Sequence, residues 1–147
     1  MPMPKSAILF RIAAILLLLF AAGHTYGFLT LVPPTPEAAA VRSSMDSVTF
    51  VIHGKSFSYG GFYLGLGLFI SAFYLFLAIL SWRLGSMAKR AAPDTRFLCG
   101  LLTLLMIIGF GLAMRFFGGG PAVLSALAAF TFGAATLTTP AAAPSGR

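Results

Sequence analysis

The sequence predicts an all-α fold, an integral membrane four-helix bundle with an extracytoplasmic amphipathic helix between its first and second spanning helices. Of the 147 residues, 59% are hydrophobic and only 9% are charged, whereas about a quarter of a soluble domain is charged. Four uncharged or nearly uncharged runs have about the length that a bilayer requires, roughly 20 residues of helix. The basic residues stand between these runs, which is typical of a multi-span membrane protein.

The first predicted span covers residues 12–31 and follows a short segment that contains Lys5 and Arg11. A cleaved signal peptide is the alternative, because Arg11, a leucine-rich core and the small residues 21–23 resemble one. The apolar run continues past those residues, and three more runs follow, which favours an uncleaved helix. Prolines 33, 34 and 36 end this helix, since proline has no backbone N–H to donate.

Residues 36–52 are predicted to form the amphipathic helix. Thr35 is a suitable N-cap, Pro36 suits the first helical position, and Glu37 lies in the first turn. Four apolar residues then recur at helical spacing: Val41, Met45, Val48 and Ile52. We expect this helix either to lie on the membrane surface or to cover the bundle.

The second predicted span, residues 60–82, has the clearest pattern in the chain. On a helical wheel its small residues fall on one half and its aromatic residues on the other. The small half contains Gly60, Gly61, Gly65, Gly67, Ser71, Ala72 and Ala78, and the bulky half contains Phe62, Tyr63, Phe69, Phe73, Tyr74 and Phe76. We expect the small half to face the other helices, so that leucine at Gly65 would disturb a close helix contact.

The remaining predicted spans cover residues 97–117 and 121–137, with a glycine turn at 118–120 between them. The four spans form a single domain of residues 1–137. The Pro/Ala-rich segment 138–147 is predicted to be a disordered cytoplasmic tail. The sequence shows no repeat of the length found in solenoid or propeller proteins.

The basic residues predict the orientation, because cytoplasmic loops carry the excess of Lys and Arg. With the N-terminus inside, seven basic residues are cytoplasmic: Lys5, Arg11, Arg83, Lys89, Arg90, Arg96 and Arg147. Three lie outside: Arg42, Lys55 and Arg115. Both termini are therefore expected in the cytoplasm of a bacterium, with the protein in its inner membrane.

Several classes of function are disfavoured by what the sequence lacks. Its one cysteine, Cys99, leaves no paired thiols for disulfide chemistry. No Asp or Glu lies inside a span, which argues against coupled transport. The sequence contains no phosphate-binding loop, and its basic residues are too dispersed for nucleic acid. We expect no cofactor, no metal and no catalytic residue, and the lipid bilayer is the first partner.

The candidate ligand-binding or polar packing residues are centred on His24, an ionisable residue inside the first span. Thr25 follows it, and the others lie at the outer end of the second span: His53, Tyr59 and Tyr63. Two alternatives stay open. These residues bind a ligand, or His24 bonds a neighbouring helix while the tyrosines form an interfacial aromatic belt.

Small residues at a spacing of four predict close helix packing in three of the four spans. The predicted packing residues are Gly23 and Gly27 in the first span, Gly61, Gly65, Gly67 and Ser71 in the second, and Ser125, Ala129 and Gly133 in the last. This pattern predicts a tight bundle and is compatible with a homo-oligomer or a membrane protein partner.

Three segments in order carry a resemblance. Gly-His-Thr occupies residues 23–25, a proline-rich exit leads to an apolar segment around Val41 and Phe50, and Ser-Tyr-x-x-Phe-Tyr-x-Gly-x-Gly spans residues 58–67. In this order the chain, up to Trp82, resembles a family of small four-helix bacterial membrane proteins without an assigned activity. In that family an acidic residue often precedes the Phe-Tyr pair, where this chain has Gly61. The resemblance implies the architecture and no biochemical role.

The sequence thus predicts a small multi-pass membrane protein that is not an enzyme and has a structural or interaction role. The alternative is binding of a lipid, a quinone or another apolar ligand near His24. Transport is disfavoured by the absence of acidic residues from the spans.

Overall fold

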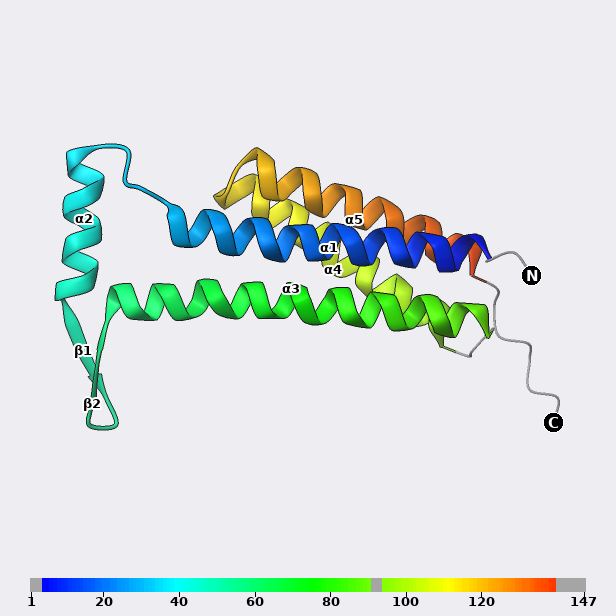
Figure 1. Cartoon of the computed structure of the whole chain (residues 1–147), viewed down its shortest axis with the longest axis horizontal. Coiled ribbons are helices and arrows are strands. Elements are labelled where there is room, and N and C mark those ends of the chain that lie inside the picture. The colour runs from blue at the N-terminus through cyan, green and yellow to red at the C-terminus, as the bar shows by residue number, and fades with distance from the viewer. Residues whose placement is uncertain (1–3, 91–93, 140–147) are drawn as a thin grey trace. The chain divides into compact units, whose positions relative to one another are not determined.

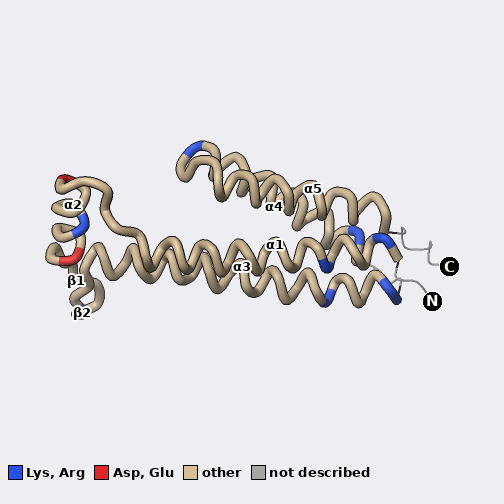
Figure 2. Tube along the Cα trace, turned by 45° about the horizontal axis from the view of Figure 1, so that its top comes forward, with Lys and Arg blue, Asp and Glu red and all other residues tan. Residues whose placement is uncertain are grey.

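The computed structural model describes residues 4–90 and 94–139. In these residues the chain forms five helices and one two-stranded hairpin (Figure 1). The order is α1 (Lys5–Thr30), α2 (Pro36–Ser47), β1 (Thr49–Ile52), β2 (Lys55–Ser58), α3 (Tyr59–Lys89), α4 (Thr95–Phe116) and α5 (Gly119–Thr138). Four of the helices, α1, α3, α4 and α5, are long and apolar enough to cross a membrane. Along them the tube carries few charged residues (Figure 2).

The four long helices coincide with the predicted spans but extend beyond them. α1 begins at Lys5 instead of residue 12, and α3 continues past Trp82 to Lys89. α5 begins at Gly119 and so includes glycines assigned to the turn, although Gly118, with a positive φ of 80°, does mark the break between α4 and α5. The disordered tail predicted for 138–147 falls outside the described residues from residue 140 onward.

The chain forms two compact units. The larger unit contains Met1–Phe20 and Tyr74–Arg147, and the smaller unit contains Ala21–Phe73. The larger unit thus combines the first part of α1 and the second part of α3 with α4 and α5. The smaller unit contains the remaining parts of α1 and α3 together with α2 and the hairpin.

The core of the larger unit is built from all four of its helices. Phe10 of α1 and Phe132 of α5 are both fully buried, with ring centroids 6.4 Å apart. The hydroxyl of Ser81 on α3 donates to the Phe10 carbonyl oxygen at 2.9 Å, and the thiol of Cys99 on α4 donates to the Phe132 carbonyl oxygen at 3.1 Å. Polar side chains bonded to backbone carbonyls therefore accompany the apolar packing. α4 and α5 run antiparallel along each other.

In the smaller unit, α2 begins as the sequence predicts. The Thr35 hydroxyl accepts the Ala38 N–H at 3.2 Å, and Pro36 occupies the first turn. The pKa of the Glu37 carboxyl is lowered, chiefly by a hydrogen bond from its own backbone N–H and also by the Thr35 hydroxyl. Arg42 and Asp46 pair one turn apart, Nε to Oδ2 3.4 Å. These contacts satisfy the first turn and stabilise the helix locally.

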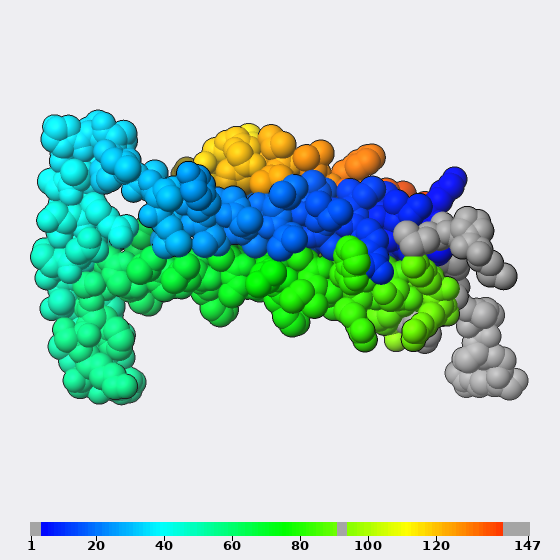
Figure 3. Space-filling model, in the orientation of Figure 1, coloured from blue at the N-terminus to red at the C-terminus, as the bar shows by residue number. Residues whose placement is uncertain are grey.

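The helix predicted to reach Ile52 ends at Ser47, and this part of the prediction is wrong. Residues 49–52 instead form β1, which pairs antiparallel with β2 in the register Thr49↔Ser58 to Ile52↔Lys55. The two turn residues both have positive φ, 50° for His53 and 76° for Gly54. This is the pattern of a type I′ turn, whose twist matches that of a hairpin. Figure 3 shows α2 and the hairpin forming one continuous surface.

Candidate functional site

His24 makes its polar contact within the chain. Its Nδ1 lies 3.0 Å from the hydroxyl oxygen of Ser71 on α3. Its ring stacks on Phe28, one turn later on α1, with centroids 5.7 Å apart and planes 11° from parallel. Ser71 also donates to the Gly67 carbonyl oxygen at 3.3 Å. This geometry is that of a polar link between two apolar helices.

Phe28 joins His24 to one of the predicted tyrosines. Its ring lies 5.0 Å from that of Tyr63, and it covers Gly67 so closely that a Cβ at Gly67 would overlap it. We call His24, Phe28, Tyr63, Gly67 and Ser71 the His24 cluster. Gly67 is required here because any side chain would displace the aromatic ring.

The other candidate residues lie apart from this cluster. The Thr25 hydroxyl donates to the Ala21 carbonyl oxygen at 2.7 Å within its own helix. His53 is exposed at the hairpin turn, and in the described part of the chain it makes no hydrogen bond or ring contact with His24. Tyr59 packs on Phe50 of β1, with centroids 4.8 Å apart, and is half exposed. The structure thus brings His24 and Tyr63 together, but not His53 or Tyr59.

Three of the predicted packing glycines do not pack against another helix. In the described part of the chain, nothing lies within 4 Å of a Cβ built at Gly23, Gly27 or Gly65. At Gly61 the only such neighbour is the hydroxyl of Ser58, 3.1 Å away, which also accepts the Gly61 N–H at 2.9 Å. For these residues the predicted close helix contacts are therefore corrected. Among the predicted packing glycines of α3, the close approach occurs at Gly67, because Phe28 lies there.

The small residues of α5 lie against α4 and the core of the larger unit. Ser125 is buried, and a Cβ at Gly109 of α4 would lie 3.7 Å from its hydroxyl oxygen. A Cβ at Gly133 would likewise lie 3.7 Å from the Thr103 side chain. Ala129 packs against the core of the larger unit. This stripe lies along the α4–α5 contact.

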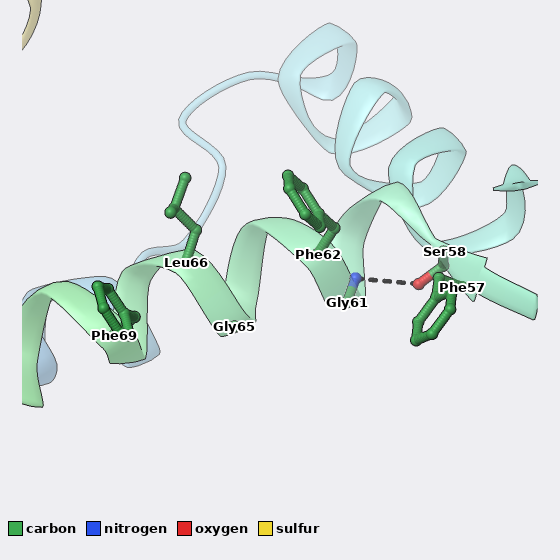
Figure 4. Close-up of a pocket in the computed structure, with 7 residues that line it drawn as sticks. All are labelled: Phe57, Ser58, Gly61, Phe62, Gly65, Leu66 and Phe69. Carbon is green, nitrogen blue, oxygen red and sulfur yellow. Dashed lines mark hydrogen bonds between the residues drawn. The ribbon is translucent and has the colours of Figure 1, made fainter. Parts of the chain in front are cut away.

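Gly61 and Gly65 instead form the floor of an open groove of about 410 Å³ at the start of α3 (Figure 4). Phe57 and Phe62 lie on opposite sides of Gly61 in this view. The lining is apolar except for Ser58, and it consists of Phe57, Ser58, Gly61, Phe62, Gly65, Leu66 and Phe69. A groove of this composition can accept an apolar side chain, an acyl chain or the backbone of another helix.

No family model matches the chain, and searches of curated proteins and of solved structures likewise find no similar protein. Among the described residues, no three His, Cys, Asp or Glu side chains lie close enough to hold a metal ion.

Proposed function

We propose that this chain is a four-span protein of a bacterial inner membrane, with both termini in the cytoplasm. Four long apolar helices support the spanning architecture. Lys5 at the start of α1, Lys89 at the end of α3 and Arg96 at the start of α4 support the orientation, because they lie at helix ends predicted to be cytoplasmic. The resemblance to small four-helix bacterial membrane proteins agrees with this architecture.

The orientation is tested with reporter fusions. The second span was predicted to end at residue 82, but α3 continues to Lys89, so the first reporter is placed after Arg90. Fusions after Arg90 and Gly146 are expected to report cytoplasm, and a fusion after Gly118 is expected to report periplasm. A periplasmic signal after Arg90 or Gly146 would refute the topology.

We further propose that the protein has a non-enzymatic interaction role. The observation that carries this proposal is the open groove over Gly61 and Gly65. Within residues 4–90 and 94–139 these glycines contact no other helix, and Phe62 and Phe69 beside them are 61% and 70% exposed. Close backbone approach is what drives helix association in lipid. The occupant is then a helix of a second copy or of another membrane protein.

Cysteine cross-linking tests this role. The one native thiol, Cys99, is fully buried, so it does not compete with an introduced cysteine in the cross-linking reaction. We expect Gly65→Cys to give a discrete adduct in native membranes, either a disulfide dimer or a complex of defined larger mass. Phe130→Cys, at an exposed position of α5, is the control and should give none.

The rival function is binding of a lipid or quinone near His24. Mass spectrometry of the protein purified in mild detergent distinguishes it from the interaction role. The interaction role predicts no stoichiometric small molecule that depends on His24, because His24 already bonds Ser71 and stacks on Phe28. A bound molecule lost in His24→Leu, with no adduct at Gly65→Cys, would replace the proposal by its rival.

A further inference from the structure

Arg11 stands out in the larger unit because its charge is only partly satisfied. Its side chain is half-buried, and its guanidinium carbon lies 3.4 Å above the centroid of the Trp82 ring. Such stacking is favourable, and more so when the cation is shielded from water. It orients the planar guanidinium but leaves its N–H groups in need of acceptors.

The hydrogen bonds of Arg11 do not satisfy all of its N–H donors. Nη2 lies 3.4 Å from the Ser86 hydroxyl oxygen, longer than a typical N–H···O bond. Nη1 is covered and has no hydrogen-bond partner among the described residues. A covered donor without an acceptor is costly, and it commonly marks the place of a water molecule or an ion.

In the described part of the chain, no Asp or Glu side chain forms an ion pair with Arg11. The sequence has three acidic residues, of which Glu37 and Asp46 belong to α2 of the smaller unit and Asp94 precedes α4. Within residues 4–90 and 94–139, the one ion pair with an N···O distance of 4.0 Å or less joins Arg42 to Asp46. The segments outside these ranges contain no Asp or Glu. The counter-charge of Arg11 must therefore come from outside the acidic side chains of this chain.

The position of Arg11 indicates which negatively charged group can reach it. It lies two turns into α1, opposite the last turns of α3, where Trp82 is 50% exposed. Other basic residues lie near the start of α1, the end of α3 and the start of α4: Lys5, Arg83, Lys89, Arg90 and Arg96. Tryptophan and basic residues of membrane proteins concentrate at the interface, where the phosphates of the lipid headgroups lie.

We propose that Arg11, with Trp82 and Ser86, binds the phosphate group of an anionic phospholipid. The guanidinium can donate Nη1–H and Nη2–H to two phosphate oxygens, which is the paired geometry that arginine forms with phosphate. The Ser86 hydroxyl can donate to a third oxygen. Gly85 lets α1 and α3 approach closely beside this site, since a Cβ there would lie 3.2 Å from Phe10 Cβ and 3.3 Å from the Ala7 carbonyl oxygen. The exposed part of the Trp82 ring lies against the lipid.

Binding at this site changes the surroundings of Trp82. Nη1 is covered by the chain itself, so the guanidinium must move to present it to phosphate. Because the guanidinium stacks on Trp82, this movement alters the environment of the indole. Trp82 is the only tryptophan of the sequence, so its fluorescence reports on this site alone.

The test is a fluorescence titration of the full chain, purified in a zwitterionic mild detergent. Phosphatidylglycerol is expected to change the Trp82 emission saturably, and phosphatidylcholine at the same concentration is not. If inorganic phosphate produces the same change over the same concentration range, the site takes free phosphate and the lipid assignment fails. Absence of a saturable change with phosphatidylglycerol would also overturn the proposal.

Four variants that retain Trp82 locate the site. Arg11→Gln is expected to abolish the saturable change, and Arg11→Lys, which keeps the charge but loses the paired donors, should weaken binding by about tenfold or more. Arg11→Lys also decides the matter if Arg11→Gln does not fold.

Two control variants remove other arginines. Arg83→Gln removes an exposed charge beside Trp82, and Arg115→Gln removes an arginine 5.3 Å from the Phe116 ring. Both should bind as the native chain does. Equal weakening in Arg11→Lys and Arg83→Gln would indicate diffuse charge attraction and contradict a site.

Discussion

Replacing Phe132 by alanine is expected to destabilise the larger unit by about 3–5 kcal/mol, the usual range for removing a buried phenylalanine. The side chain is fully buried on α5 and packs on the equally buried Phe10 of α1. Between membrane helices the transfer of apolar surface contributes little, so the loss is mainly one of packing contacts around a cavity. The carbonyl oxygen of Phe132 also accepts the Cys99 thiol, so its backbone is held at the same point.

Phe130→Ala is the matched control, because it removes the same side chain from the same helix where it is 77% exposed. Denaturation of both variants in detergent, followed by circular dichroism, gives the comparison. We expect Phe130→Ala to stay close to the native chain. Equal losses in the two variants would show that α5 packs through a different face from the one the structure presents.

Helix number and type could be predicted from the sequence, because each long helix is a run of apolar residues without acids. The start of α2 was also predictable, since capping depends on local contacts between neighbours such as Thr35 and Ala38. The ends of the long helices were less predictable. α1 and α3 continue into the basic segments because helix hydrogen bonding does not stop where hydrophobicity does.

The hairpin was missed although the sequence carries its signal. Thr49, Phe50, Val51 and Ile52 are β-branched or aromatic, and a two-residue turn containing Gly54 follows. The apolar residues Val48 and Ile52 also fit the helical spacing of Val41 and Met45, so the pattern does not distinguish helix from strand there. In the structure, packing of Phe50 against Phe57, Tyr59 and Phe62 accompanies the strand conformation.

The rotation of α3 could be predicted only in part. Nine of its buried or half-buried positions alternate at spacings of four and three, as in a heptad seam: Gly60, Leu64, Gly67, Ser71, Tyr74, Ala78, Ser81, Gly85 and Ala88. The other buried or half-buried positions flank this seam: Ile70, Leu77, Leu80, Leu84, Ser86 and Met87. Four members of the predicted small half belong to this seam, and Gly61, Gly65 and Ala72 lie outside it. The sequence could not separate the two groups, since a glycine permits a close approach without requiring one. The side chains of the facing helix determine where the close approach occurs, as Phe28 of α1 does at Gly67.

The His24 cluster shows the same limit. That His24 would find a partner was predictable, because a polar group in an apolar span needs one. That the partner is Ser71 depends on how α1 and α3 are aligned along their axes, and no local pattern specifies this. The Arg11 and Trp82 pair had a weak signal, since both residues lie at the predicted inner boundary of their spans.

Gly67→Leu is expected to destabilise the smaller unit by about 1–3 kcal/mol, the usual cost of overpacking. A Cβ at this position would overlap the Phe28 ring, which in turn contacts both His24 and Tyr63. The larger leucine must therefore push Phe28 away and disturb the link between His24 and Ser71. Gly65→Leu adds the same side chain two residues earlier, where a Cβ meets nothing within 4 Å in the described part of the chain.

Thermal denaturation of both variants, in detergent at a dilution where the protein is monomeric, measures the difference. Under these conditions Gly65→Leu should resemble the native chain, because its open groove is not filled by the chain itself. Amide hydrogen exchange localises the effect, with faster exchange expected around Phe28 and Ser71 in Gly67→Leu. If Gly65→Leu lowers the thermal stability more than Gly67→Leu does, α3 is rotated about its axis so that the groove of Gly61 and Gly65 faces α1. The seam that contains Gly67 is then not the buried face of α3.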